Sequence, residues 1–198
     1  MTDLSRLKQQ LDLIVELDKL KSVLRRTRIK SADGRLENSA EHSWQLALMA
    51  VFLHEYSAEP VDLITVVKML LIHDVVEIDV GDTFVYDLAG TAVQAEKERL
   101  AAERIFGMLP PDQCEELLGL WLEFEAMETA ESCFAKALDR TMPMLLNHHN
   151  DGQSWLEHGV RYEQALAVNK DKISQGAPQV WEYMKTVLDD AKAKGWLA

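Results

Sequence analysis

The chain has 198 residues, of which 47% are hydrophobic, and its 33 acidic and 21 basic side chains give a net charge of −12. An acidic surface of this kind repels polymeric nucleic acid and anionic membranes, so neither is an expected partner. Nine glycines and five prolines are also too few for a typical all-β or disordered chain.

Apolar residues recur every three or four positions along most of the chain, and this spacing predicts helices. In chain order we expect a helix over 4–24, a loop over 25–38, helices over 39–56 and 60–80, a loop over 81–90, and helices over 91–106, 110–122, 129–150, 159–168 and 178–192. Ser39 and Thr129 are suitable N-caps, and Pro60 suits the first turn of a helix. The sequence therefore predicts one compact all-α domain, over residues 1–198, with about seven or eight helices.

The location of the protein is predicted from features at the N-terminus and from the cysteines. Met1-Thr2-Asp3-Leu4-Ser5 lacks the pattern of a signal peptide, and no apolar run approaches the ~18–20 residues that cross a bilayer. Cys114 and Cys133 are not spaced as metal ligands, and two reduced thiols are typical of the cytosol. We therefore expect a cytoplasmic protein that does not span a membrane.

A histidine and an aspartate stand side by side in the apolar run Leu70-Leu71-Ile72-His73-Asp74-Val75-Val76. Burying these two groups costs several kcal/mol unless both have partners, and a metal ion is an efficient partner. Glu77 follows Asp74 by one helical turn, and Gly81 then allows Asp82 to turn back toward the same end. His42 and Asp139, each near apolar residues on other predicted helices, are candidates to complete such a site.

Taken together, these motifs are similar to those of a known family. Glu41-His42-Ser43, Ile72-His73-Asp74, Glu77, Gly81-Asp82 and Ala137-Leu138-Asp139 resemble the HD-domain metal-dependent phosphohydrolases, and among these the bacterial 5'-deoxynucleotidase-like group. The resemblance covers roughly Leu11 to Asn150. It implies a metal-binding core over about 38–150, with residues 151–198 as closing helices.

The resemblance implies that His42, His73, Asp74 and Asp139 bind one divalent ion. Two imidazoles and two carboxylates suit a transition metal with open positions, and Mn²⁺, Co²⁺, Fe²⁺ and Zn²⁺ all remain candidates. Glu77 and Asp82 are implied to be the catalytic carboxylates, with either one giving or taking the proton. The structural alternative is that Glu77 is only a solvated helix end and that Asp82 is only a turn residue.

The substrate implied by the resemblance is a small phosphorylated molecule, most simply a nucleotide. The densest basic segment lies between positions 19 and 30, and from it Lys21, Arg25 and Arg26 are candidates to bind the phosphate. The Arg-Trp pair of the characterised deoxynucleotidases has no counterpart here, because the matching region reads Leu20-Lys21-Ser22. The preference for deoxyribose or ribose therefore stays open.

Three functions remain at this point. The first is a phosphomonoesterase acting on nucleoside 5'-monophosphates. The second is an HD-type phosphodiesterase or pyrophosphohydrolase of a signalling nucleotide, and the third is a non-catalytic helical interaction module stabilised by a metal. The family resemblance also implies a homodimer.

Overall fold

A computed structural model describes residues 4–86 and 91–198 of the chain. The described elements are α1 (Leu4–Glu16), η1 (Leu17–Ser22), β1 (Leu24–Ile29), η2 (Lys30–Ala32), β2 (Arg35–Asn38), α2 (Ser39–Leu53), η3 (His54–Tyr56), α3 (Leu63–Ile72), α4 (Glu77–Val80), α5 (Thr91–Phe106), α6 (Pro111–Ala126), α7 (Ala130–His149), α8 (Gln153–His158), α9 (Tyr162–Gly176) and α10 (Pro178–Ala193), where η marks a 3-10 helix. The all-α fold is confirmed, with a two-stranded hairpin as the sheet of the described residues.

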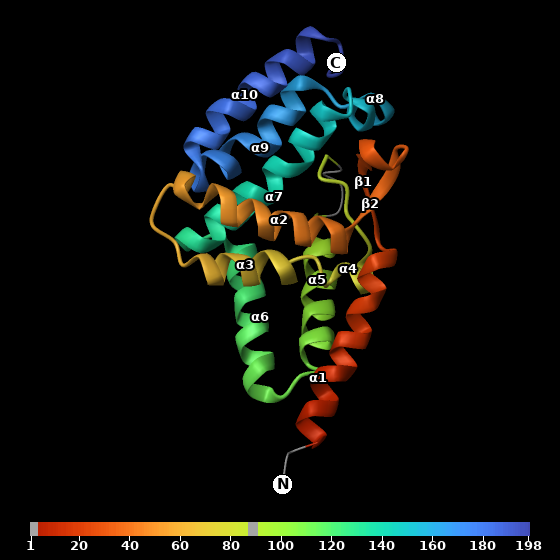
Figure 1. Ribbon diagram of the computed structural model, residues 1–198, viewed down its shortest axis with the longest axis vertical. Helices are drawn as coiled ribbons and strands as arrows, with labels where there is room; N and C mark the ends of the chain where they lie inside the picture. Colours follow the sequence, from red (N-terminus) through yellow and green to blue (C-terminus); the bar gives the residue numbers. More distant parts are fainter. Residues whose placement is uncertain (1–3, 87–90) are drawn as a thin grey trace.

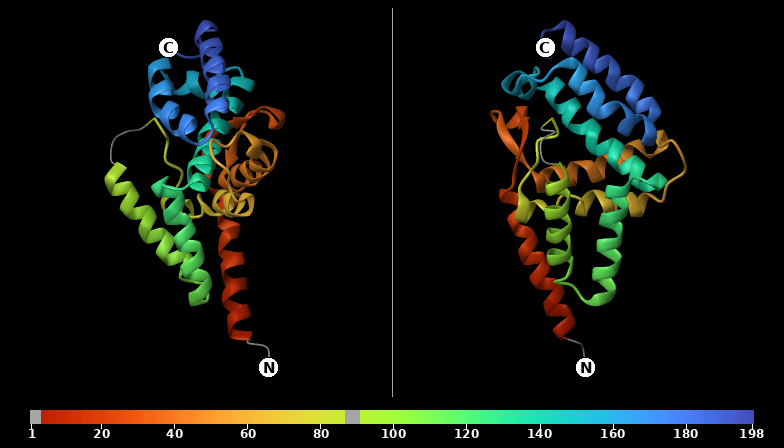
Figure 2. Two further views of the ribbon diagram at one scale, coloured as in Figure 1. Left: turned by 90° about the vertical axis from the view of Figure 1, so that its left-hand side faces the viewer. Right: turned by 180° about the vertical axis from the view of Figure 1, so that it is seen from behind.

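The helices are arranged in three groups along the long axis of the molecule (Figure 1). α7, α9 and α10 run alongside one another near the C-terminal end, and α2 and α3 lie across the middle. α1, α5 and α6 extend toward the N-terminal end, and the β-hairpin lies beside α8. The two views of Figure 2 show the same long shape, with α1 and α10 toward opposite ends.

Two hydrophobic cores hold these groups together. The larger core joins α2, α3, α7, α9 and α10 through fully buried side chains such as Leu46, Leu70 and Leu138. The smaller core joins η1, α5, α6 and the segment after α3 through residues such as Ile105 and Trp121. Burial of apolar surface of this kind is the main stabilising force of the fold. His73 lies between the two cores, because its ring contacts Phe124 and its carbonyl accepts a hydrogen bond from Trp121 Nε1 at 3.0 Å.

The expected loop over 25–38 was wrong, because this segment forms an antiparallel hairpin. Leu24 pairs with Asn38 and Ile29 pairs with Arg35, with an irregularity in the strand between them. Asp33 and Gly34 both have positive φ, at 54° and 73°, and Asp-Gly is a favoured hairpin turn. The strand was missed because its arginines hide the apolar alternation by which a strand is recognised.

Several helix boundaries also differ from expectation. The first helix ends at Glu16 and continues as the 3-10 helix η1, while the third begins after the N-cap Asp62 and ends at Ile72. A turn over 73–76 separates it from the short helix α4, so His73 and Glu77 do not lie on one continuous helix. α8 was not predicted, and α9 continues to Gly176.

The N-cap of α2 is Asn38 and not Ser39. The Asn38 side chain accepts a hydrogen bond from the backbone N–H of Glu41 at 3.0 Å, and Glu41 accepts one from the Asn38 N–H at 3.3 Å. This capping box satisfies two backbone donors at the helix start. It leaves the Ser39 hydroxyl, which is fully buried, free to bind elsewhere.

The described residues contain no helix with the length and apolar character needed to cross a bilayer.

Thr129 caps α7 as predicted, through a hydrogen bond from the Ser132 N–H to its hydroxyl at 3.2 Å. α7 is 20 residues long, carries Asp139 near its middle and packs against α2, α3 and α9. It is therefore the element that brings Asp139 to the residues of α2 and α3.

Candidate metal and catalytic site

Three side chains from three helices meet at one buried point. His42 lies in the first turn of α2, His73 is the C-cap of α3, and Asp139 lies in the middle of α7. One donor atom from each lies within 4.8 Å of the others, which is the spacing of a metal-binding cluster. His42 Nε2 is 3.2 Å from Asp139 Oδ1, and His73 Nε2 is 3.6 Å from the same oxygen. The structure thus brings together residues that are 97 positions apart in the chain.

The imidazole of His73 is oriented so that its Nε2 faces this cluster. Its Nδ1 lies 2.9 Å from the carbonyl oxygen of Leu70, and only a protonated Nδ1 donates to a carbonyl. In the neutral ring Nε2 then offers its lone pair, and this atom is buried without a hydrogen-bond partner. A buried polar atom left without a partner is costly. A divalent ion would satisfy it, so the residues present fit a metal site.

His42 is fully buried, and a carboxylate that the sequence analysis missed lies behind it. Glu37 Oε2 is 3.5 Å from His42 Nδ1, on the side of the ring away from Asp139. Both atoms are buried without a hydrogen bond, and Glu37 is 2% exposed. Burial and Arg25 act to lower the pKa of His42, but Asp139 and Glu37 outweigh them and raise it. Glu37 is therefore placed to hold the ring by its outer nitrogen.

Asp74 lies next to this cluster and is paired mainly with an arginine. Its Oδ2 accepts a hydrogen bond from Arg25 Nη1 at 2.6 Å, and its Oδ1 is 3.1 Å from His73 Nε2. The distance from its Oδ2 to His42 Nε2 is 3.9 Å. Asp74 thus approaches both imidazoles from the hairpin side, whereas Asp139 approaches them from α7.

Arg25 is surrounded by carboxylates. Its Nη1 lies 3.6 Å from Glu77 Oε1 and 3.7 Å from Asp82 Oδ1, in addition to its bond with Asp74. Its Nε lies 3.7 Å from Glu37 Oε2, and the Arg25 side chain is only 13% exposed. One guanidinium therefore offsets the charge of the acidic groups around the cluster.

Glu77 has one oxygen held and the other facing Arg25. The Ser39 hydroxyl donates a hydrogen bond to Glu77 Oε2 at 2.5 Å, which leaves Oε1 for other partners. Burial and the negative charge of Asp74 raise the pKa of Glu77 to about 9, against the opposing effects of Arg25 and Ser39. In the metal-free chain these surroundings favour the protonated form of Glu77. A dication nearby would lower this pKa, because positive charge favours the carboxylate.

Asp82 and Asp79 have different surroundings. The Asp82 side chain is 9% exposed, lines the cavity described below, and has a pKa raised by burial. Gly81, with φ of 75°, makes the turn that directs the chain to it. Asp79 instead binds Arg104 on α5, at 2.7 Å from Nη2, and takes no part in the cluster.

A cavity of about 580 Å³ opens beside the cluster. His73, Asp74, Glu77, Asp82 and Asp139 line one part of it. Other walls come from the hairpin, the segment 83–86, α6, α7 and α9, and the lining includes Phe84, Tyr86 and the buried amides Asn147 and Asn169. A volume of this size is ordinary for a small-molecule site.

The predicted phosphate-binding cations are placed unequally around this cavity. Arg26 is exposed and lines it, whereas Arg25 also lines it but is bound to Asp74. Lys21 is exposed, pairs with Asp18 at 2.6 Å and lies outside the cavity lining. Lys136, Arg140 and Lys172 also line the cavity.

The fold and the cluster together define an all-α protein with a candidate metal site at the edge of a cavity. Consistent with this, the model of the HD domain family matches residues 17–181 of the chain. The chain therefore belongs to the HD domain family. Membership and the donor set together imply a divalent metal ion.

Similarity to individual proteins supports the same family. The chain is similar to a predicted metal-dependent phosphohydrolase from Magnetospirillum magnetotacticum MS-1, with 46% identity, a TM-score of 0.92, and coverage of 98% of this chain and 96% of the other. It is 31% identical over 106 residues, 54% of this chain and 50% of the relative, to 5'-deoxynucleotidase HDDC2 of Homo sapiens. The same protein of Dictyostelium discoideum is 26% identical over 127 residues, covering 62% of this chain and 67% of the relative. The chain thus spans about half the length of the human relative.

Proposed function

We propose that this protein is a divalent-metal-dependent phosphohydrolase that removes the phosphate from nucleoside 5'-monophosphates. The observation that carries the proposal is the buried cluster of His42, His73 and Asp139, with the carboxylates of Glu77 and Asp82 facing the adjoining cavity. A structural metal site would need no further carboxylates beside an open cavity. The names of the HDDC2 relatives support a nucleotide as the substrate, over the part of their length that matches.

In this proposal His42, His73, Asp74 and Asp139 hold the ion. When bound, a divalent ion polarises a phosphoryl oxygen and makes a water molecule more acidic. Glu37 and the Leu70 carbonyl keep the two imidazoles oriented through their outer nitrogens. The identity of the ion among Mn²⁺, Co²⁺, Fe²⁺ and Zn²⁺ is left to measurement.

Glu77 is proposed to move the proton of the reaction at its Oε1, because its Oε2 is held by Ser39. The oxygen of water forms a bond to phosphorus, the bond from phosphorus to the nucleoside oxygen breaks, and that oxygen gains a proton. Asp82 lies across Arg25 from Glu77, and is placed to contact the water or the leaving oxygen. Arg26, exposed at the cavity wall, is the candidate among the three predicted cations to bind the phosphate.

The nucleoside is proposed to occupy the part of the cavity lined by Phe84, Tyr86, Asn147 and Asn169. Phe84 and Tyr86 contact each other edge to face at 5.3 Å between ring centres, and aromatic rings at a cavity wall are candidates to stack on a base. Asn147, which is 8% exposed, also lines the cavity, and its amide is the candidate to bind a base or a sugar hydroxyl.

A screen for release of inorganic phosphate tests the function. Nucleoside 5'-monophosphates with and without the 2'-hydroxyl would be incubated with protein that has been chelated and reloaded with each of the four ions. We expect phosphate from at least one of these substrates, and none after chelation. Release of pyrophosphate or opening of a cyclic diester would instead select a phosphodiesterase or pyrophosphohydrolase, and no turnover with any ion would favour a non-catalytic module.

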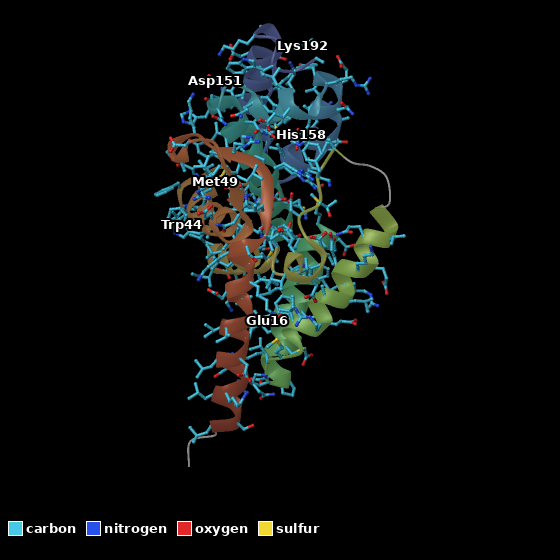
Figure 3. All side chains as sticks on the ribbon, turned by 90° about the vertical axis from the view of Figure 1, so that its right-hand side faces the viewer. Glu16, Trp44, Met49, Asp151, His158 and Lys192 are labelled. Atoms are coloured by element: carbon cyan, nitrogen blue, oxygen red, sulfur yellow. The ribbon has the colours of Figure 1, made fainter. Side chains whose placement is uncertain are left out.

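A homodimer and a cytoplasmic location are further proposals. The dimer is supported by an exposed apolar face on α2, where Trp44 is 61% and Phe52 70% exposed, together with Leu48 and Val51. Trp44 projects at the outer side of α2 in Figure 3. A face of this kind is typical of an interaction surface. Light scattering on the protein as purified would report twice the chain mass for a dimer.

A further inference from the structure

Three cations from two helices line one wall of the cavity. Lys136 and Arg140 lie one turn apart on α7, and Lys172 lies on α9. α7 and α9 run side by side, as both views of Figure 2 show. Their packing is close, since a Cβ on Gly176 of α9 would lie 2.0 Å from the Cys133 carbonyl oxygen of α7. The two helices therefore hold the three cations in a fixed arrangement.

Acidic partners account for only part of this group of cations. Lys136 Nζ binds Glu125 Oε1 at 3.0 Å and lies 3.8 Å from the centre of the Phe124 ring. Arg140 Nε is 3.9 Å from Asp139 Oδ2, and it is buried without a hydrogen bond. Lys172 is partly buried and forms no ion pair with any residue that the structure describes.

The lack of a partner for Lys172 is unusual in this chain, whose net charge is −12. Most lysines and arginines of residues 4–86 and 91–198 are paired with a carboxylate, and those outside the cavity that are not, such as Lys97 and Lys170, are exposed. Burial and the positive charges of Arg140 and Lys136 lower the pKa of Lys172 to about 8. Like charges gathered at a partly buried wall repel one another, and an anion among them would remove this cost.

This wall adjoins the metal cluster at Arg140, whose Nε is 3.9 Å from Asp139 Oδ2, and it also includes two lysines that are not assigned to the reacting phosphate. Those two are Lys136 on α7 and Lys172 on α9, and Asp139 and Glu125 are the acids that act on Lys172. Burial raises the pKa of Glu98, which also lines the cavity. A single phosphate bound at the metal would leave these cations in surplus.

We propose that Lys136, Arg140 and Lys172 form a second anion subsite, which binds a phosphate group of the substrate other than the one that is hydrolysed. The substrate class is then a nucleotide with phosphates at two positions, such as a nucleoside 3',5'-bisphosphate. This proposal rests on the proposed function, because that function determines which phosphate of the substrate is hydrolysed. Binding of the second phosphate is measurable without turnover.

The test compares a nucleoside 3',5'-bisphosphate with the matching 5'-monophosphate by isothermal titration calorimetry. The metal-loaded protein carries Glu77→Gln to block turnover, and Lys172→Met and Lys172→Arg are each added to it. Lys170→Met is the matched control, because Lys170 is an exposed lysine on the same helix. Inorganic phosphate added to the monophosphate shows whether a free anion occupies the subsite instead.

We expect the bisphosphate to bind about tenfold more tightly than the monophosphate, as one added charge-assisted contact would give. Lys172→Met should remove most of this gain, Lys172→Arg should retain it, and Lys170→Met should leave it unchanged. Equal binding of the two nucleotides, or an equal loss for both in Lys172→Met, would overturn the proposal, as would occupancy by free phosphate alone. If the wild type releases no phosphate from any nucleotide, the proposed function fails while this comparison still reports on the subsite.

Discussion

Arg25 on β1 donates a hydrogen bond from Nη1 to Asp74 Oδ2 at 2.6 Å, and so joins the hairpin to the turn that follows α3. The same guanidinium faces Glu77 and Asp82 at 3.6 and 3.7 Å. A residue that we expected to bind phosphate therefore has a second role in the structure, which is to offset the charge of the carboxylates beside the metal cluster.

Replacing Arg25 with methionine should destabilise the metal-free protein. The change keeps much of the side-chain volume but leaves buried carboxylates without their cation, and breaking a buried ion pair costs about 3 kcal/mol or more. Chemical denaturation with and without a divalent ion measures this cost. We expect the ion to restore part of the lost stability, and an unchanged free energy of unfolding would contradict the role given to Arg25.

Changing Glu37 to glutamine should weaken metal binding without removing a metal ligand. Glu37 lies behind His42, with 3.5 Å between its Oε2 and Nδ1, and residues in this position typically contribute about tenfold to hundredfold to metal affinity. Competition with a chelating dye would measure the loss. Glu41→Gln serves as the control, because Glu41 binds Arg35 and caps α2 without contacting the cluster. Equal metal affinity in the Glu37 variant and the wild type would remove Glu37 from the site.

Glu77→Gln should lower kcat by about 100-fold to 10,000-fold, as expected when a group that moves a proton is lost. Metal content should stay near that of the wild type, because Glu77 is not among the proposed ligands. Asp79→Asn is the matched control, since Asp79 is an acid two positions away that binds Arg104. Retained activity in Glu77→Gln would mean that another group, with Asp82 the first candidate, transfers the proton.

Binding of the second phosphate should weaken as the pH rises through about 8. The pKa of Lys172 is lowered to about 8 by burial and by Arg140 and Lys136, against the smaller opposing effects of Asp139 and Glu125. Below this pH Lys172 is charged and attracts the anion, and above it the charge is lost. A bound phosphate should in turn raise the pKa. Titrations of the bisphosphate between pH 7 and 9 would show the loss, which Lys172→Arg should abolish because arginine stays charged.

The sequence was sufficient to predict the helical fold, because most helices carry an apolar face with the helical period. It was also sufficient to nominate His42, His73 and Asp139, which the fold brings together from three helices. Their meeting depends on long-range packing that periodicity does not encode, and here the family resemblance supplied the missing information. The hairpin was missed because arginine-rich strands lack apolar alternation, and Glu37 was missed with it.

The cationic wall shows a different limit of sequence reasoning. Lys136 and Lys172 are separated by 36 positions of chain (172 − 136) and look like ordinary surface lysines of amphipathic helices. Their shared environment arises from the close packing of α7 on α9, where Gly176 allows the two backbones to approach. Only the structure reveals that Lys172 is partly buried and lacks an acidic partner among the described residues.

Anomalous diffraction from a crystal of the protein, grown with Mn²⁺ after chelation, tests the central claim most directly. The claim is that His42, His73, Asp74 and Asp139 hold one divalent ion at the edge of the cavity. It predicts a single strong anomalous peak within about 2.5 Å of His73 Nε2 and of His42 Nε2. No peak at this point, or a peak held by other residues, would contradict the account.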